Sequence, residues 1–126
     1  MVGIAQWTID ARDVAGLAKF WAQALGYRAE ADNDGCTRLY PPDDAPPGSP
    51  TVWLQPVDDV KVVKNRVHWD LPPGVDGTQA EVERLLALGA RQVDVGQSDT
   101  ETFVVLADPE GNEFCVLDGE RRSMGG

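Results

Sequence analysis

The residues best suited to acid–base chemistry in this chain are His68 and Asp70. His68 is the only histidine, and Asp70 follows it by two positions. Side chains two apart on an extended strand face the same side, so the imidazole and the carboxylate can meet. Such a pair can take a proton from a bound substrate and return it. The alternative is a structural role, in which His68 lies on a strand, bonds to a nearby carboxylate and takes no part in a reaction.

The cysteines Cys36 and Cys115 lack the spacing of a disulfide framework or a CxxC metal clip. Cys115 could act as a nucleophile if a neighbouring base or positive charge lowered the pKa of its thiol. A cysteine on an apolar strand is more often a small core residue. Both interpretations stay open at this point.

A local basic cluster, Lys61, Lys64 and Arg66, precedes His68 in an otherwise acidic chain. Arg66 shares strand parity with His68, which makes it the best candidate for contacting an anionic group of a ligand. Alternatively, the cluster forms ion pairs with the two aspartates just upstream or with a partner subunit.

Aromatic side chains can add stacking surface to a ligand site. Trp53 and Tyr40 could stack on an aromatic or planar ligand. Trp7, Trp21 and Trp69 fit a core better, although an exposed helix edge with Trp21 could also serve dimer packing.

These residues are positioned by a plan that occurs twice. Each half opens with a strand-like run and continues into a helical segment that closes on Leu-Gly. The closing glycines, Gly26 and Gly89, lie 63 positions apart (89 minus 26) in a chain of 126 residues. Two copies are too few for a solenoid. The repeat favours a pseudo-symmetric domain whose halves enclose a pocket.

Apolar residues at spacings of three and four predict a helix over 14–25, with Asp13 as its N-cap. A second helix is expected to begin with Asp76 or Thr78 as its cap and to end at Gly89. The expected strands are 4–9, 27–31, 37–40, 51–57, 66–71, 91–95, 102–107 and 113–117, with tight turns at 33–35 and 108–112.

Strand parity separates a polar face from an apolar face. One face is expected to line the pocket and the other to pack against a helix. The pocket face holds Gln6, Thr8, Trp53, Gln55, Arg66, His68, Asp70, Glu113 and Cys115. The helix-packed face holds Trp7, Ile9, Val52, Leu54, Val67, Trp69, Phe114 and Val116.

Length and charge exclude several classes of protein. A chain of 126 residues fits one domain, with a first module over about 3–57, a link over 58–65, a second module over 66–118 and a tail over 119–126. A net charge of -10 opposes binding to nucleic acid or anionic membranes. No membrane span or leader is apparent, so a cytoplasmic protein is expected.

Three segments, in this order and spacing, carry a family resemblance: residues 18–22 (AKFWA), 64–71 (KNRVHWDL) and 108–117 (DPEGNEFCVL). With the doubled plan, they make the chain similar to the vicinal oxygen chelate superfamily, nearest to small bacterial glyoxalase-like and bleomycin-resistance-like proteins. The resemblance implies an α+β fold of two βαβββ modules. Their curved mixed sheets would form a half-open barrel with the helices outside. It also implies a homodimer.

The resemblance further implies positions for a metal ion: Gln6, Gln55 (with Trp53 as the alternative), His68 and Cys115. Hard divalent ions prefer carboxylates, and a catalytic zinc site has three strong protein ligands. Two amides, one imidazole and one thiol fit neither requirement well. No metal ligand is therefore assigned, and a divalent cofactor is not favoured.

Two functions follow from the resemblance. The first is an enzyme of lyase or isomerase type that binds a small molecule in the barrel pocket and uses His68, beside a degraded metal site. The second is a non-catalytic protein that sequesters a drug or antibiotic. A structural or regulatory module is a third reading. The candidate catalytic residues are His68, Asp70 and Cys115, and the candidate ligand-binding residues are Gln6, Trp53, Gln55, Arg66 and Tyr40.

Overall fold

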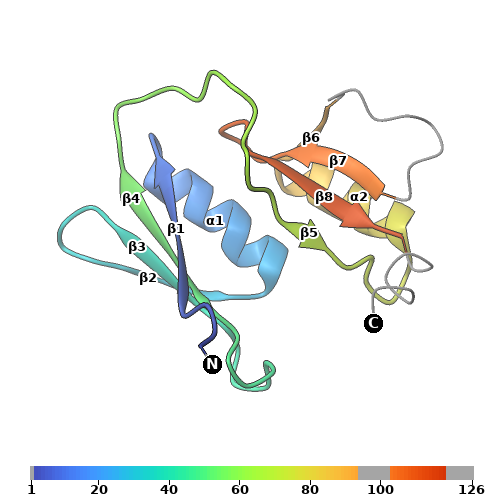
Figure 1. Cartoon of the computed structure of the whole chain (residues 1–126), viewed down its shortest axis with the longest axis horizontal. Helices are drawn as coiled ribbons and strands as arrows, with labels where there is room; N and C mark the ends of the chain where they lie inside the picture. Colours follow the sequence, from blue (N-terminus) through green and yellow to red (C-terminus); the bar gives the residue numbers. More distant parts are fainter. Residues whose placement is uncertain (1, 94–102, 119–126) are drawn as a thin grey trace. The chain divides into compact units, whose positions relative to one another are not determined.

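The computed structural model describes residues 2–93 and 103–118. The chain forms two compact units, Met1–Val60 and Lys61–Gly126. In its described residues, each unit runs strand, helix and three strands, and its four strands form one sheet (Figure 1). The predicted α+β class and the two βαβββ units are confirmed. The half-open barrel, which requires the two sheets to combine, stays a prediction.

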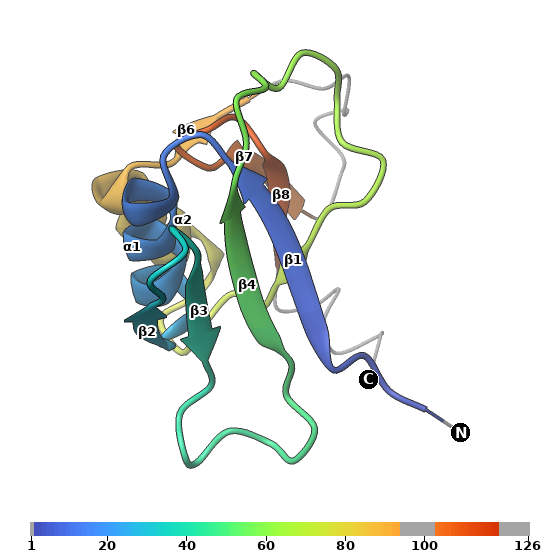
Figure 2. The same cartoon turned by 90° about the vertical axis from the view of Figure 1, so that its left-hand side faces the viewer.

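The first unit contains one helix and a mixed sheet. Its strand order is β1-β4-β3-β2, in which β1 runs parallel to β4 and the other neighbours are antiparallel. In Figure 2, α1 lies against one face of this sheet. The elements are β1 (Gln6–Ala11), α1 (Val14–Leu25), β2 (Arg28–Ala31), β3 (Thr37–Tyr40) and β4 (Thr51–Pro56).

Helix α1 begins and ends where its sequence predicts. The Asp13 carboxylate accepts a hydrogen bond from the Gly16 N–H at 3.1 Å, and Gly26 ends the helix in the left-handed region at φ +71°. Trp21 is only 2% exposed and packs edge-on against Phe20. The prediction that Trp21 belongs to the core is therefore confirmed, and the alternative of an exposed helix edge for dimer packing is wrong.

The second unit repeats this plan with shorter strands. Its strand order is β5-β8-β7-β6, and β5 runs parallel to β8. The elements are β5 (Asp70–Leu71), α2 (Thr78–Leu88), β6 (Arg91–Gln92), β7 (Phe103–Ala107) and β8 (Glu113–Leu117).

Within the described part of the chain, neither helix has the length and apolar character needed to cross a bilayer.

The strand that carries His68 is much shorter than predicted. Only residues 70–71 pair as β5, and the chain bends at 66 and 67. Upstream of this bend, the Asn65 N–H donates to the Glu113 carboxylate, so this part of the chain is held by a side chain and not by a neighbouring strand. Val67 is 65% exposed and does not join the core.

The start of α2 also differs from its prediction. The N-cap is Gly77, which has no side chain to cap the helix, so neither Asp76 nor Thr78 serves as the cap. The Thr78 hydroxyl instead donates to the Leu117 carbonyl at 3.1 Å, which ties α2 to the end of β8. The predicted strand residues 94, 95 and 102 and the predicted tail 119–126 lie outside the described residues.

Burial agrees with the predicted faces in the centre of each sheet. Val52 and Leu54 of β4, and Phe114 and Val116 of β8, are all at most 2% exposed. Other members of the helix-packed face, Trp7, Ile9 and Trp69, are half-buried. Alternation along β4 therefore predicts the core correctly, whereas in β8 Cys115 is buried as well, and burial is less complete on the edge strand β1 and just before β5.

The predicted turn at 108–112 is a tight hairpin built around a buried carboxylate. Asp108 is 1% exposed, and its carboxylate accepts from the N–H groups of Glu110 and Asn112 at 2.9 Å and from the Asn112 side chain. The Gly111 N–H donates to the Asp108 carbonyl at 2.9 Å. The turn thus satisfies a charge that burial would otherwise penalise.

Replacing Asp108 with alanine should destabilise the second unit by about 2–4 kcal/mol, because the variant leaves several hairpin donors buried without an acceptor. Urea unfolding followed by circular dichroism measures this loss. Asp76→Ala, at an exposed position, is the control and should change stability little. Equal stability of the two variants would contradict a structural role for the Asp108 carboxylate.

Candidate functional site

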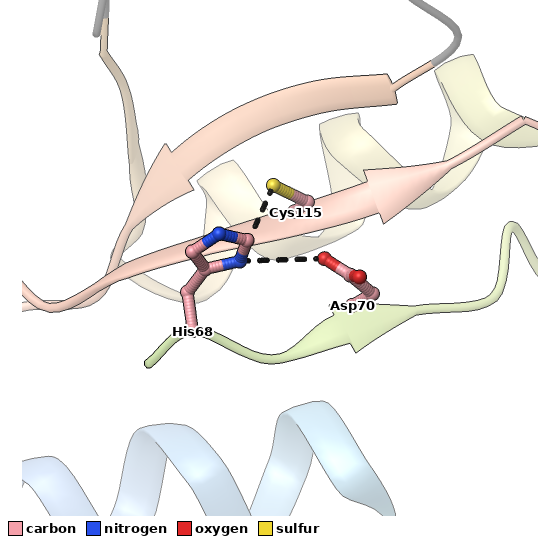
Figure 3. Close-up of side chains that lie close together, drawn as sticks. All are labelled: His68, Asp70 and Cys115. Atoms are coloured by element: carbon pink, nitrogen blue, oxygen red, sulfur yellow. Dashed lines mark hydrogen bonds and ion pairs between the residues drawn. The ribbon is translucent and has the colours of Figure 1, made fainter. Parts of the chain in front are cut away.

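The structure brings His68, Asp70 and Cys115 together in the second unit, and these three residues are called the His68 cluster here. Their possible ligand atoms all lie within 4.8 Å of one another. Asp70 and Cys115 are register partners on β5 and β8, and the Cys115 N–H donates to the Trp69 carbonyl at 2.8 Å. Figure 3 shows the three side chains converging, Asp70 from β5, Cys115 from β8 and His68 from the segment just before β5.

His68 and Asp70 form an ion-pair contact that is open to solvent. His68 Nδ1 lies 3.4 Å from Asp70 Oδ1, and the side chains are 39% and 50% exposed. This distance is slightly longer than a normal hydrogen bond. Because a carboxylate only accepts, a proton on Nδ1 would face Asp70 and would leave a lone pair on Nε2. In that tautomer the pair would suit an oriented base.

Cys115 supports this pair as a buried thiol. It is 5% exposed, and its Sγ lies 4.0 Å from His68 Nδ1. The pKa of the Cys115 thiol is raised to about 11, first by burial and then by the charge and hydrogen bond of Asp70, while the Lys64 ammonium acts to lower it. The thiol is therefore protonated at neutral pH. This state favours a donor to Asp70 over a nucleophile.

In the first unit, the two glutamines do not come together. Gln6 pairs with Thr51 and Asp10 pairs with Gln55, so the glutamines are four residues apart along the strand pair, a distance of about 13 Å. The Gln6 amide oxygen accepts from the Thr51 hydroxyl at 3.0 Å, and the Gln55 amide donates to Asp10 at 2.7 Å. Each glutamine therefore has a local partner.

The internal repeat identifies Trp53 as the counterpart of Cys115. Gln6 and His68 differ by 62 positions, as do Trp53 and Cys115. The strand registers agree, because Thr8 pairs with Trp53 as Asp70 pairs with Cys115. Trp53 is the alternative that the sequence left open for this position, and an indole supplies no metal ligand.

Two arginines that the sequence analysis did not select cover the candidate aromatic residues. The Arg38 guanidinium lies 5.5 Å from the Trp53 ring centre, and the Arg28 guanidinium lies 4.9 Å from that of Tyr40. Both pairs are cross-strand neighbours, since Arg38 faces Trp53 and Arg28 faces Tyr40 in the antiparallel ladders. The hairpin turn at 33–35 joins β2 to β3 and was the available signal for the Arg28–Tyr40 pair.

The Arg38–Trp53 pair leaves two buried donors unsatisfied. Within the described residues, Arg38 Nε and Trp53 Nε1 have no hydrogen-bond partner. The nearby Cys36 thiol has its pKa raised by burial and by Asp34, and the Trp53 indole acts in the opposite direction without forming a normal hydrogen bond. This part of the sheet face is therefore polar but incompletely paired.

The basic cluster divides into residues with different roles. Lys61 pairs with Glu113 at 2.8 Å, and not with the aspartates just upstream of it. Lys64 lies close enough to influence the Cys115 thiol. Arg66 is exposed and stays the candidate for an anion contact. Glu113 was placed on the pocket face by parity but was not selected as a functional residue.

A family model described as a glyoxalase-like domain matches residues 6–117. A search of curated proteins finds no match.

Several solved structures share the fold. The chain is similar to the fosfomycin resistance protein FosX from Mesorhizobium loti, with a TM-score of 0.71 and 13% identity, covering 98% of this chain and 99% of that one. It is also similar to a possible glyoxalase from Bacillus cereus (TM-score 0.67, 16% identity, covering 93% and 99%). A third is a FosX mutant from Listeria monocytogenes complexed with Mn(II) and 1S,2S-dihydroxypropylphosphonic acid (TM-score 0.69, 12% identity, covering 93% and 90%). At these identities, the likeness shows the fold alone.

The raised pKa of Cys115 predicts a slowly reacting thiol at neutral pH. In a Cys36→Ala variant, alkylation of Cys115 by iodoacetamide should accelerate from pH 7 to pH 10 without levelling, because only the thiolate reacts and the pKa is about 11. The same protein in urea is the control, and its rate should begin to level near the ordinary cysteine pKa of about 8.5. A plateau below pH 8 in the folded protein would show that Cys115 is a thiolate nucleophile.

Proposed function

We propose that this chain, which belongs to the glyoxalase-like domain family, binds a small molecule at the His68 cluster. It then transfers a proton from one atom of that molecule to another, as a lyase or isomerase does. The observation that carries this proposal is the 3.4 Å contact between His68 Nδ1 and Asp70 Oδ1 at a position that solvent reaches. That it acts as a homodimer, and in the cytoplasm, stays a prediction.

The side chains of the cluster have complementary parts in such a reaction. With Nδ1–H directed at Asp70, His68 Nε2 can accept a proton from a carbon next to a carbonyl group of the ligand. Asp70 then stabilises the imidazolium, and His68 returns the proton to an adjacent atom, which completes an isomerisation. The Cys115 thiol remains protonated and supports Asp70 from the buried side.

The family resemblance implies a metal ion, and the His68 cluster provides ligands that suit one kind of ion. His68 Nδ1, the Asp70 carboxylate and Cys115 Sγ form the nitrogen, oxygen and sulfur set that suits zinc. When bound, such an ion would polarise a carbonyl oxygen as a Lewis acid. One carboxylate is a poor set for Mg²⁺ or Mn²⁺, which prefer oxygen. An ion on Nδ1 would displace Asp70 from His68, so it competes with the acid–base arrangement.

Proton abstraction by His68 can be measured without knowing the natural substrate. The hemithioacetal of methylglyoxal and glutathione is a suitable probe, and its C–H signal should disappear in D₂O in the presence of the protein. His68→Gln should slow this exchange by about 10²–10⁴-fold, and Asp70→Asn should slow it less, because the base is kept and only its orientation is lost. Proton NMR follows the exchange.

Glu83→Gln, on the exposed side of α2, is the matched control and should exchange at the wild-type rate. Exchange should also persist after treatment with a chelator. Equal rates for the wild type and His68→Gln would refute the proposal. Loss of exchange on chelation, with a stoichiometric metal that His68→Ala no longer binds, would replace it with a metal-dependent reaction.

Sequestration of a planar ligand is a second candidate, favoured by the Arg38–Trp53 pair. The pair provides a guanidinium stacked on an indole, beside two buried donors that lack partners within the described residues. The acidic composition favours a cationic ligand for the whole protein, but here the guanidinium favours a planar anion. Asp32 and Asp34 in the adjacent turn act on Arg38 and partly offset its charge. Any charge preference should therefore be modest.

Calorimetric titration with 1-naphthoate and with 1-naphthylmethylamine tests this candidate. The anion should bind a few-fold more tightly than the amine, and Arg38→Gln should abolish this preference because the guanidinium supplies it. Arg12→Gln, an exposed arginine of the same unit, is the control. Tighter binding of the amine, or a preference that survives Arg38→Gln, would exclude the pair as the ligand site.

A further inference from the structure

The link before His68 is fixed by one carboxylate of β8. Lys61 Nζ lies 2.8 Å from Glu113 Oε2, and the Asn65 N–H donates to Glu113 Oε1 at 3.0 Å. The Lys61 and Glu113 side chains are only 19% and 13% exposed. Both oxygens of one side chain therefore hold the two ends of the segment 61–65.

A second contact fixes the orientation of Asn65. Its side-chain amide donates to Asn112 Oδ1 at 3.2 Å, and Asn112 in turn donates to the buried Asp108 carboxylate. Asn65 is thus joined to the β7–β8 hairpin through both its backbone and its side chain. The hairpin is the most extensively hydrogen-bonded turn described above.

His68 lies between two backbone contacts with β8, one at Asn65 and one at Trp69. Upstream, Asn65 is held by Glu113, and downstream, the Trp69 carbonyl accepts from the Cys115 N–H. Only residues 66–68 separate the two contacts, and they bend instead of pairing as a strand. The conformation of this short bend decides where the imidazole lies, because no ladder constrains it.

We propose that Glu113 is a positioning residue for His68, which holds the segment 61–65 so that the imidazole meets Asp70. This role deepens the proposed function and rests on it. Replacing the carboxylate would leave the Lys61 ammonium largely buried without its partner and would free the upstream end of the bend. Burial acts to raise the pKa of Glu113, but Lys61 and the Asn65 N–H lower it overall, so the carboxylate is ionised at neutral pH.

The single histidine makes the position of the imidazole directly measurable. Nuclear Overhauser effects between the His68 ring protons and the Cys115 β-protons report on the contact at 4.0 Å. Glu113→Gln removes the charge but keeps the shape, and Lys61→Met removes the ammonium but keeps the Asn65 bond. Both should at least halve the Overhauser effect, with the larger loss in Glu113→Gln. Glu83→Gln, the same chemical change on α2, should leave it unchanged.

Proton exchange of the hemithioacetal probe is measured on the same samples, and should slow by about tenfold or more in Glu113→Gln because misplacement of a base is costly. Dispersed amide signals of α2 confirm that the variants are folded. Unchanged Overhauser effects in either folded variant would overturn the positioning role, whatever the exchange rate. The acid–base proposal fails separately, if His68→Gln exchanges like the wild type.

Discussion

The parallel pairing of β5 with β8 is the constraint on which the candidate site depends. It consists of two residue pairs, one of which places Asp70 opposite Cys115. The thiol on β8 is buried, whereas the carboxylate on β5 is half-exposed and faces solvent. His68 is outside the ladder and meets both groups from the bend that precedes it. Packing of β8 thus fixes the buried half of the cluster, and side-chain contacts fix the rest.

The two units share a plan but use equivalent positions differently. Where the second unit has an imidazole and a thiol, the first has the amide of Gln6 and the indole of Trp53. The amide accepts from a neighbouring hydroxyl, and the indole is covered by the Arg38 guanidinium. At these equivalent positions, the second unit has titratable groups, while the first has an amide and an indole beside a guanidinium. Duplication has preserved the backbone registers while the side chains at equivalent positions have diverged.

Local patterns predict most of the fold and only part of the site. The helix 14–25, its Asp13 cap and the turn at 108–112 depend on residues close in sequence, and the structure contains them as predicted. Parity also placed His68 and Asp70 on one side. The short length of β5 could not be predicted, because residues 66 and 67 bend and the chain before them is held by a side chain distant in sequence, Glu113, which accepts from the Asn65 N–H. The same reason explains why Glu113 was not selected from the sequence.

The protonated state of both thiols has a consequence for how the protein tolerates oxidants. Peroxides attack the sulfur anion, and the pKa of each cysteine is raised by burial. Sulfenic acid formation at Cys115 would place a polar oxygen against the apolar interior of β8 and disturb the neighbouring carboxylate. A chain whose sulfur atoms stay neutral resists this damage. Both cysteines should therefore tolerate oxidants that modify thiolates.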